Sequence, residues 1–169
     1  IDIVAIVALV QLKKINALVK KGIKEGAKLW QPSWSCPTEG LFYPPSLFTN
    51  VTPASFIAQV EIFGPVLSVL PFEDEADALI QANAVDYGLA GYVWTGDVGR
   101  AHRVAEKLDA GMIWINSENV RHLPSPFGGM KASGVGRDGG DYSFDFYMET
   151  KNICVATTNH RVPRMGLAE

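Results

Sequence analysis

Apolar residues near the start of the chain recur about every three or four positions, which is typical of an amphipathic helix. Lysines occupy many of the positions around this stripe, so the polar face is basic. Glycines at positions 22 and 26 are poor helix residues, and the helix is expected to end near Glu25. The apolar positions of this predicted helix are Leu12, Ile15, Leu18, Val19 and Ile23.

Beyond Pro65, short apolar runs alternate with segments of helical spacing. Asp74 and Asp97 stand where a helix cap is expected, because an aspartate side chain accepts the first free N–H groups of a helix. Strands that alternate with helices predict crossover connections and a mainly parallel sheet, so the expected fold class is α/β. The predicted strands cover residues 27–30, 41–43, 47–51, 66–72, 89–94, 112–116 and 152–156, and the later helices cover 74–83, 97–108 and 142–149.

Residues 117–141 form a long predicted loop, and loops of this length are often functional. Within it, residues 134–139 match the Gly-x-Gly-x-x-Gly spacing of the dinucleotide-binding fingerprint. That fingerprint works only between a hydrophobic strand and a helix whose N-terminus faces the pyrophosphate. Residues 129–133 are not such a strand, and no acidic residue stands at the ribose-reading position about twenty residues on. We therefore interpret the segment as a glycine-rich loop and not as a phosphate site.

The composition limits the classes of function. The chain has 169 residues, 47% hydrophobic and 20% charged, which is enough for one ordinary core. Its net charge of -3 predicts no basic patch for nucleic acid, and no apolar run is long enough to span a membrane. The first residues include Asp2 and lack a basic leader, so no secretory signal is expected. A cytoplasmic location is the default expectation.

Two segments resemble the late signatures of the aldehyde dehydrogenase superfamily, a group of NAD(P)-dependent oxidoreductases. They are Glu61-Ile62-Phe63-Gly64-Pro65-Val66 and Ser125-Pro126-Phe127-Gly128-Gly129. The resemblance extends over nearly the whole chain and implies the C-terminal part of the catalytic domain of a much longer enzyme. It implies oxidation of an aldehyde to the acid, with NAD or NADP as the cofactor.

The first segment supplies two candidate cofactor contacts. The carboxylate of Glu61 can accept hydrogen bonds from two adjacent ribose hydroxyls, and Phe63 can lean against a flat ring such as nicotinamide. From spacing alone, the simpler interpretation is a solvated glutamate beside a core phenylalanine. The resemblance favours the cofactor roles, because this motif supplies ribose and nicotinamide contacts in the superfamily. Val60 departs from the superfamily, which usually has a second glutamate there.

Phe127 and Arg121 are the candidate substrate contacts. The resemblance places Phe127 on the wall of the aldehyde tunnel, where an apolar surface excludes water; the alternative is a core residue that anchors the loop. Residues 117–124 match the variable substrate-anchoring loop and are most similar to the hydroxymuconic semialdehyde dehydrogenase branch, whose substrates carry carboxylates. Arg121 is then a candidate carboxylate reader, because a guanidinium binds a carboxylate with two parallel hydrogen bonds. The alternative is a surface arginine paired with Glu118.

No catalytic residue is expected within this chain. The resemblance implies a cysteine nucleophile and a glutamate that activates water. Cys36 lies in a proline-flanked segment and Cys154 in an apolar strand, so neither matches a nucleophile turn. The nucleophile, the glutamate and the phosphate-binding half are expected upstream of Ile1, and the chain alone is expected to be inactive. The three histidines lack the spacing of metal ligands, so no metal site is expected. The polar loop residues that we interpret as structural are Lys131, Ser133 and Arg137.

The end of the chain is the candidate assembly region. Residues 1–150 are assigned to the catalytic-domain portion and residues 151–169 to an oligomerisation strand and tail. Residues 152–156 are β-rich, and an exposed strand edge pairs readily with another chain. Aromatic residues within 142–148 either serve assembly into a dimer or tetramer or pack within the chain. The alternative to an enzyme part is a catalytically dead, truncated family member that acts as a structural or assembly module.

Overall fold

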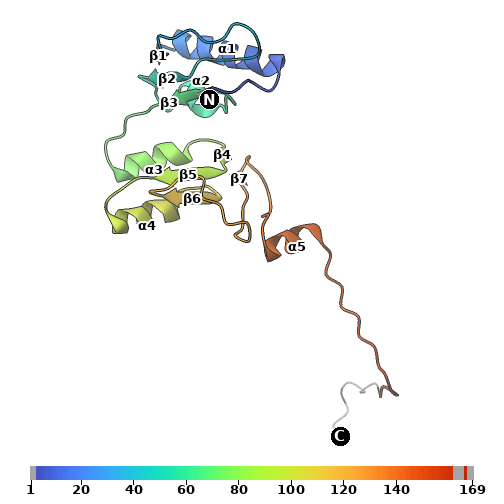
Figure 1. Cartoon of the computed structure of the whole chain (residues 1–169). Coiled ribbons are helices and arrows are strands. Elements are labelled where there is room, and N and C mark those ends of the chain that lie inside the picture. Colours follow the sequence, from blue (N-terminus) through green and yellow to red (C-terminus); the bar gives the residue numbers. More distant parts are fainter. Residues whose placement is uncertain (1–2, 162–165, 167–169) are drawn as a thin grey trace.

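The computed structural model describes residues 3–161 and residue 166. Two groups of elements follow each other along the chain in Figure 1, and a short helix and an extended tail project away from the second group. The first group holds α1 (Leu9–Lys24), β1 (Lys28–Trp30), β2 (Ser46–Thr49), α2 (Phe56–Gln59) and β3 (Val66–Ser68). The second group, followed by α5 (Asp141–Tyr147), holds α3 (Glu75–Asn83), β4 (Tyr87–Gly88), β5 (Ala90–Val93), α4 (Val98–Lys107), β6 (Met112–Ile115) and β7 (Met130–Lys131).

Strand pairing is divided among three small sheets. In the first sheet, β2 lies between β1, which is antiparallel to it, and β3, which is parallel to it. In the second group, β5 and β6 pair in parallel with α4 as their crossover, whereas β4 and β7 pair in antiparallel. The expected α/β class, with parallel pairs and crossover helices, is therefore confirmed, although two of the four pairings are antiparallel.

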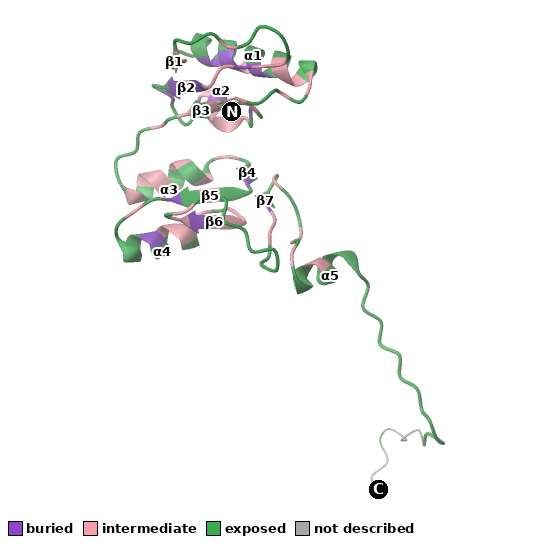
Figure 2. Cartoon of the chain, viewed as in Figure 1, coloured by how far each residue is buried: buried purple, intermediate pink, exposed green. Residues whose placement is uncertain are grey.

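The main apolar core lies in the first group, where α1 packs over the strands (Figure 2). Two positions of the predicted helical stripe, Ile15 and Val19, are 0% and 4% exposed, as the apolar periodicity predicts. Ile62, in the connection between α2 and β3, belongs to the same core. The buried residues of this cluster are Ile15, Val19, Ala27, Tyr43, Phe48, Val51, Ile57 and Ile62.

Two aspartates begin the helices of the second group, as predicted. Asp74 and Asp97 each accept a hydrogen bond from the backbone N–H three residues later, at 2.8 Å in both cases. The carboxylate of Glu75 joins the two helices, because it accepts from Arg103 at 2.9 Å and from Arg100 at 3.3 Å. These contacts join the start of α3 to α4, which itself contacts β5 and β6.

Some predicted strands are shorter than expected or absent. Residues 41–43 form no strand, because the following two prolines lack the N–H groups that a sheet ladder needs. The strand predicted at 66–72 ends at Ser68. It is an edge strand of its sheet, half-buried at Val66 and Ser68 and exposed at Leu67. Residues 152–156 are extended and exposed and pair with no strand in the described part of the chain. β4 and β7, at two residues each, are too short to show an alternating pattern.

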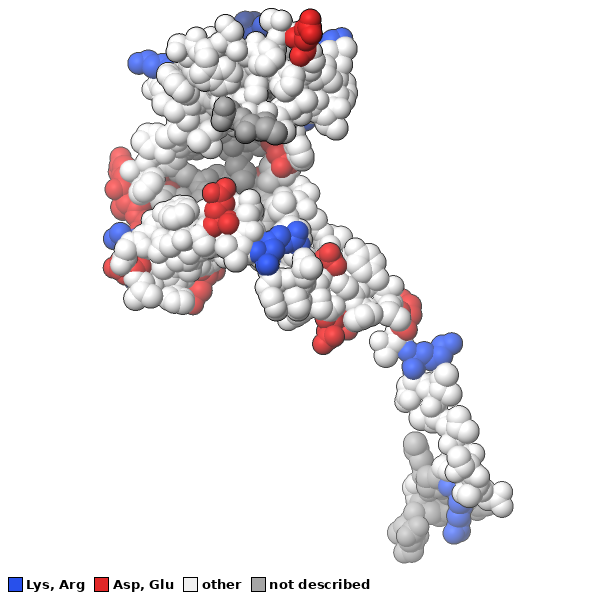
Figure 3. All heavy atoms as spheres, in the orientation of Figure 1, with Lys and Arg blue, Asp and Glu red and all other residues white. Residues whose placement is uncertain are grey.

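The surface agrees with the low net charge. On the face seen in Figure 3, acidic and basic side chains are interspersed and neither sign forms one continuous patch. None of the helices described between residues 3 and 161 is long and apolar enough to cross a membrane. The predicted tail at 151–169 falls partly outside the described residues, which stop at 161 apart from residue 166.

Candidate functional site

The turn that follows α2 presents both candidate cofactor contacts. Ile62 is 8% exposed and packs into the core, so its neighbours Glu61 and Phe63 on either side are directed outward. Phe63 is 68% exposed and has a positive φ of 55°, which is uncommon for a residue with a side chain. At Gly64, an added Cβ would lie 2.5 Å from Cδ1 of Ile15, so only glycine lets the turn approach α1 this closely.

One side chain of α1 holds this turn. The amide Nε2 of Gln11 donates to the carbonyl oxygens of Ile62 at 2.8 Å and Phe63 at 3.0 Å. The turn is therefore fixed from two directions, by the burial of Ile62 and by these two hydrogen bonds. Nothing in the local sequence of the motif indicates the second constraint, because Gln11 lies in a helix near the start of the chain.

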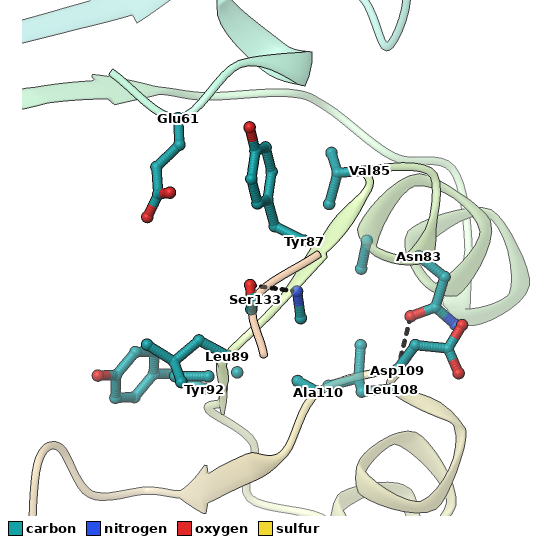
Figure 4. Close-up of a pocket in the computed structure, with 14 residues that line it drawn as sticks. Glu61, Asn83, Val85, Tyr87, Leu89, Tyr92, Leu108, Asp109, Ala110 and Ser133 are labelled. Atoms are coloured by element: carbon teal, nitrogen blue, oxygen red, sulfur yellow. Dashed lines mark hydrogen bonds between the residues drawn. The ribbon is translucent and has the colours of Figure 1, made fainter. Parts of the chain in front are cut away.

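Glu61 lines a cavity of about 460 Å³ between the first and second groups of elements. Figure 4 shows its side chain pointing into the space that is bordered by Tyr87, from β4, and by Ser133, from the loop after β7. The remaining wall is built by the end of α3, by β5 and by the segment between α4 and β6. The full lining is Glu61, Ala82, Asn83, Val85, Tyr87, Gly88, Leu89, Ala90, Gly91, Tyr92, Leu108, Asp109, Ala110 and Ser133.

Hydrogen bonds from the long loop fix the floor of this cavity. The hydroxyl of Ser133 accepts from the N–H of Gly88 at 2.9 Å, which secures the loop beside β4. Nζ of Lys131 donates to the carbonyl oxygens of Asn83 at 2.8 Å and Val85 at 3.1 Å, at the free carbonyl end of α3. These contacts agree with the structural roles predicted for the two loop residues.

The glycine-rich segment 134–139 folds as a loop. The guanidinium of Arg137 donates to the carbonyl oxygens of Gly129 at 3.0 Å and Gly136 at 2.7 Å, which closes the loop on itself. The segment follows the two-residue strand β7 and not a long hydrophobic strand. The structural role predicted for Arg137 agrees with these bonds, and the dinucleotide fingerprint is a coincidence of spacing.

The two candidate substrate contacts, Arg121 and Phe127, are in contact with each other. Cζ of Arg121 sits 4.0 Å from the centroid of the half-buried Phe127 ring. The indole N–H of Trp114, in β6, donates to the carbonyl of Val120 at 2.8 Å. This bond fixes the backbone directly before Arg121. The ion pair considered between Arg121 and Glu118 is not among the salt bridges of the described residues.

The structure thus brings the candidates together as two pairs and not as one cluster. Glu61 and Phe63 share a turn, and Arg121 and Phe127 share a stack, but Phe127 is not among the residues that line the Glu61 cavity. The sequence did not single out the other polar residues of that cavity, chief among them Asn83 and Tyr87. Their signal is weak, because Asn83 is the last residue of α3 and Tyr87 belongs to a strand of only two residues.

The cysteines and metal-binding residue types lie apart. Cys36 is half-buried in the loop before β2, Cys154 is exposed in the tail, and both are free thiols. Neither lines the Glu61 cavity. Among residues 3–161 and residue 166, no three histidine, cysteine, aspartate or glutamate side chains gather closely enough to hold a metal ion.

Known proteins are similar to nearly the whole chain. The sequence profile of the aldehyde dehydrogenase family matches residues 1–153. The chain is 42% identical over 162 residues to 2-aminomuconic semialdehyde dehydrogenase of Homo sapiens, a match that covers 92% of this chain and 33% of that protein. It is 42% identical over 150 residues to betaine aldehyde dehydrogenase of Cereibacter sphaeroides, which covers 89% of this chain and 31% of that protein.

The solved structures agree with the sequence matches. An aldehyde dehydrogenase of Bacillus cereus, solved as an NAD+ complex, has a TM-score of 0.84 and 40% sequence identity, and the match covers 91% of this chain and 31% of that one. The chain therefore spans about a third of the length of these relatives. The family resemblance carried by the segments 61–66 and 125–129 is confirmed: the chain belongs to the aldehyde dehydrogenase family.

Proposed function

We propose that this chain is the C-terminal part of an NAD(P)-dependent aldehyde dehydrogenase and that Glu61 and Phe63 contact its cofactor. The observation that carries the proposal is the turn itself, in which the buried Ile62 holds both side chains outward and Glu61 opens onto a cavity of about 460 Å³. A carboxylate is the acceptor that a ribose diol needs, and an exposed aromatic face suits a planar ring. The residues present therefore fit such a cofactor.

The work of this chain is to position the cofactor. Glu61 accepts hydrogen bonds from two adjacent ribose hydroxyls, and Phe63 presents an apolar face that keeps water from one side of the planar ring. When bound, NAD(P)+ supplies the acceptor for the hydride that leaves the aldehyde carbon. Gln11 and Gly64 fix the backbone of the turn before the cofactor binds. The entropy cost of ordering the turn on binding is therefore small.

The chemistry itself needs groups that this chain does not supply. Aldehyde oxidation in the family requires a thiolate nucleophile, and both Cys36 and Cys154 lie outside the Glu61 cavity. We place the nucleophile, the water-activating glutamate and the phosphate-binding site outside these 169 residues. The chain alone is then inactive. Its two free thiols suit a cytoplasmic protein.

For the substrate, we propose an aldehyde that carries a carboxylate. Arg121 is exposed, its Cζ lies 4.0 Å from the centre of the Phe127 ring, and it forms no salt bridge among the described residues. A semialdehyde dehydrogenase is among the similar proteins, and so is a betaine aldehyde dehydrogenase. The positive charge of an arginine favours an aldehyde that carries a carboxylate over one that carries a positive charge. If Arg121→Leu in the complete enzyme leaves the preference for acidic over neutral aldehydes unchanged, the substrate proposal fails.

The cofactor proposal is tested with Glu61→Gln in the complete enzyme. The amide keeps the shape of the side chain but offers one acceptor oxygen and no charge, so the KM for NAD(P)+ is expected to rise roughly 10-fold. Glu73→Gln, at an exposed position before α3, is the matched control and should leave that KM unchanged. A normal KM for the cofactor in the Glu61 variant contradicts the proposal.

We further propose that residues 151–169 serve assembly into a homo-oligomer, with residues 1–150 forming the catalytic-domain portion. Ile153 and Val155 are each 75% exposed on a segment without a strand partner in the described chain. An extended segment of this kind has unpaired backbone groups that another chain can satisfy. The exposed aromatic residues of α5 support the same proposal.

A further inference from the structure

The segment that leads to Arg121 is tied to the strands from which it departs. Asn116, directly after β6, has a positive φ of 50°. Its side-chain amide exchanges two hydrogen bonds with the backbone of Thr95, each at 2.9 Å. Because Thr95 follows β5, these bonds join the ends of the two parallel strands at the point where the long loop begins.

Two aromatic residues of the same strands are stacked on each other. Tyr92 in β5 and Trp114 in β6 are opposite each other in the parallel register. Their ring centroids are 5.2 Å apart, and their planes are inclined by only 13°. Trp114 is 7% exposed and Tyr92 is 43% exposed, so the buried indole supports the more exposed phenol ring.

Both members of this stack donate to the loop. The indole N–H of Trp114 donates to the carbonyl of Val120 at 2.8 Å, and the hydroxyl of Tyr92 donates to Oδ1 of Asn119 at 3.3 Å. Asn119 has a φ of 51°, a conformation that a residue with a side chain keeps only when its surroundings determine it. Two consecutive loop residues are therefore fixed to the β5–β6 pair, and the residue that follows them is Arg121.

Core packing explains only part of this arrangement. A buried tryptophan needs an acceptor for its N–H in any fold. Here the acceptor lies in the loop, six positions after Trp114, and the ring stacked on that tryptophan donates to the adjacent loop residue. Donors from two different strands thus meet at one place, directly before Arg121.

Arg121 is consequently restrained at both ends. Its backbone continues from the fixed carbonyl of Val120, and its Cζ lies 4.0 Å from the centroid of the Phe127 ring. A long arginine side chain has many rotamers, and fixing its backbone reduces the entropy that is lost when its guanidinium binds a ligand. The bonds from Tyr92 and Trp114 therefore act on the place from which Arg121 reaches a ligand.

We infer that Tyr92 and Trp114 are positioning residues that fix the backbone before Arg121 and so set the preference for aldehydes that carry a carboxylate. The role of Arg121 rests on the proposed function. In this role neither aromatic residue touches the substrate, and both act through Arg121. Tyr92 also borders the Glu61 cavity (Figure 4), so the test compares two aldehydes at one saturating cofactor concentration.

The test uses Trp114→Phe and Tyr92→Phe in the complete enzyme, with succinic semialdehyde and butanal as the acidic and neutral probes. Phenylalanine keeps a ring in the stack and removes the donor. The ratio of kcat/KM for the acidic probe over the neutral one is expected to fall roughly 3- to 10-fold in Trp114→Phe and roughly 2-fold in Tyr92→Phe, whose bond is longer and exposed. Trp94→Phe, at a 67% exposed position directly after β5, is the control and should leave the ratio unchanged.

A double variant tests whether the pair acts through Arg121. In an Arg121→Leu background, Trp114→Phe should cause no further fall in the ratio. A further fall of the same size overturns the inference, because the tryptophan would then act by another route. An equal loss of kcat/KM for both probes also overturns it, since the pair would then only support the fold. If Trp114→Phe does not fold, Tyr92→Phe, which keeps the stacked ring, is placed in the same background.

The same measurements separate this inference from the proposed function. If Arg121→Leu lowers the ratio but Trp114→Phe and Tyr92→Phe do not, the inference fails and the substrate proposal stands. If Arg121→Leu itself leaves the ratio unchanged, the substrate proposal fails and the positioning role fails with it.

Discussion

The side-chain amide of Gln11 donates to the carbonyl of Phe63 at 3.0 Å, although 52 positions of sequence separate the two residues. Phe63 has a φ of 55°, a conformation that persists in a non-glycine residue only when its surroundings determine it. The bond from α1 is one such determinant, and the buried Ile62 is the other. The orientation of the exposed Phe63 ring therefore depends on α1, a helix near the start of the chain.

Replacement of Gln11 should weaken cofactor binding through the turn. Gln11→Ala removes both hydrogen bonds to the turn, at a cost of about 1 kcal/mol in stability, and frees Phe63 to relax from its positive φ. In the complete enzyme, the KM for NAD(P)+ should rise while the KM for the aldehyde stays the same. Asn16→Ala is the control, because that amide donates only within α1. Equal cofactor binding in the two variants would remove Gln11 from this role.

The contiguous parts of the site could be predicted from the sequence. Glu61 and Phe63 lie in one short motif, and the family resemblance singled them out, although spacing alone favoured a core position for Phe63. The two helix caps could also be predicted, because the cap residue and its N–H partner lie three positions apart. For the caps, the interaction that decides the geometry is local.

The long-range parts could not be predicted. The bond of Gln11 to Phe63 and the bonds of Lys131 to the end of α3 join residues 46 to 52 positions apart, and no local pattern encodes such pairs. The predicted strand at 152–156 is wrong for the chain by itself for a related reason. Its composition indicates a strand, but a strand also needs a neighbour, and none is present in the described chain.

Replacement of Gly64 by alanine should destabilise the core beneath the turn. The new Cβ would stand 2.5 Å from Cδ1 and 2.8 Å from Cγ1 of Ile15, which is 0% exposed and cannot move away freely. The expected loss is about 1–3 kcal/mol in the free energy of unfolding, measured by urea denaturation of the 169-residue chain. Gly96→Ala is the control, since no atom lies within 4 Å of its added Cβ. Similar losses in both variants would argue against overpacking at Ile15.

Acid should weaken the start of α4 through Asp97. The hydrogen bond from the N–H of Arg100 is the main cause that lowers the pKa of Asp97 in the folded chain. A lowered folded pKa means that this stabilisation is fully present above the ordinary aspartate value, about 3.9, and is lost as the pH falls through the folded pKa. The Tm of the chain should therefore fall with acid in that range.

The contribution of Asp97 is isolated by comparison with Asp97→Asn. Asparagine caps a helix nearly as well as aspartate but does not titrate, so the variant should resemble the parent near neutral pH. Below about pH 4, its Tm should decline less steeply than that of the parent. Thermal unfolding followed by circular dichroism across this range makes the comparison. Parallel curves for the two proteins would show that the cap does not contribute to the acid sensitivity.

Charges placed on the tail should interfere with assembly without affecting the fold. Ile153 and Val155 alternate along an extended segment, so both fall on one side of it, and each is 75% exposed. The double change Ile153→Lys and Val155→Lys places two like charges on the side that a partner chain would cover, which should lower the mass of the complete enzyme in sedimentation. Ala156→Lys, on the opposite side of the same exposed tail, is the control for charge alone. If the double variant keeps the mass of the parent, these two residues do not lie in an interface. If the variant is monomeric and its Tm is also lower than that of the parent, the two residues pack within the chain instead.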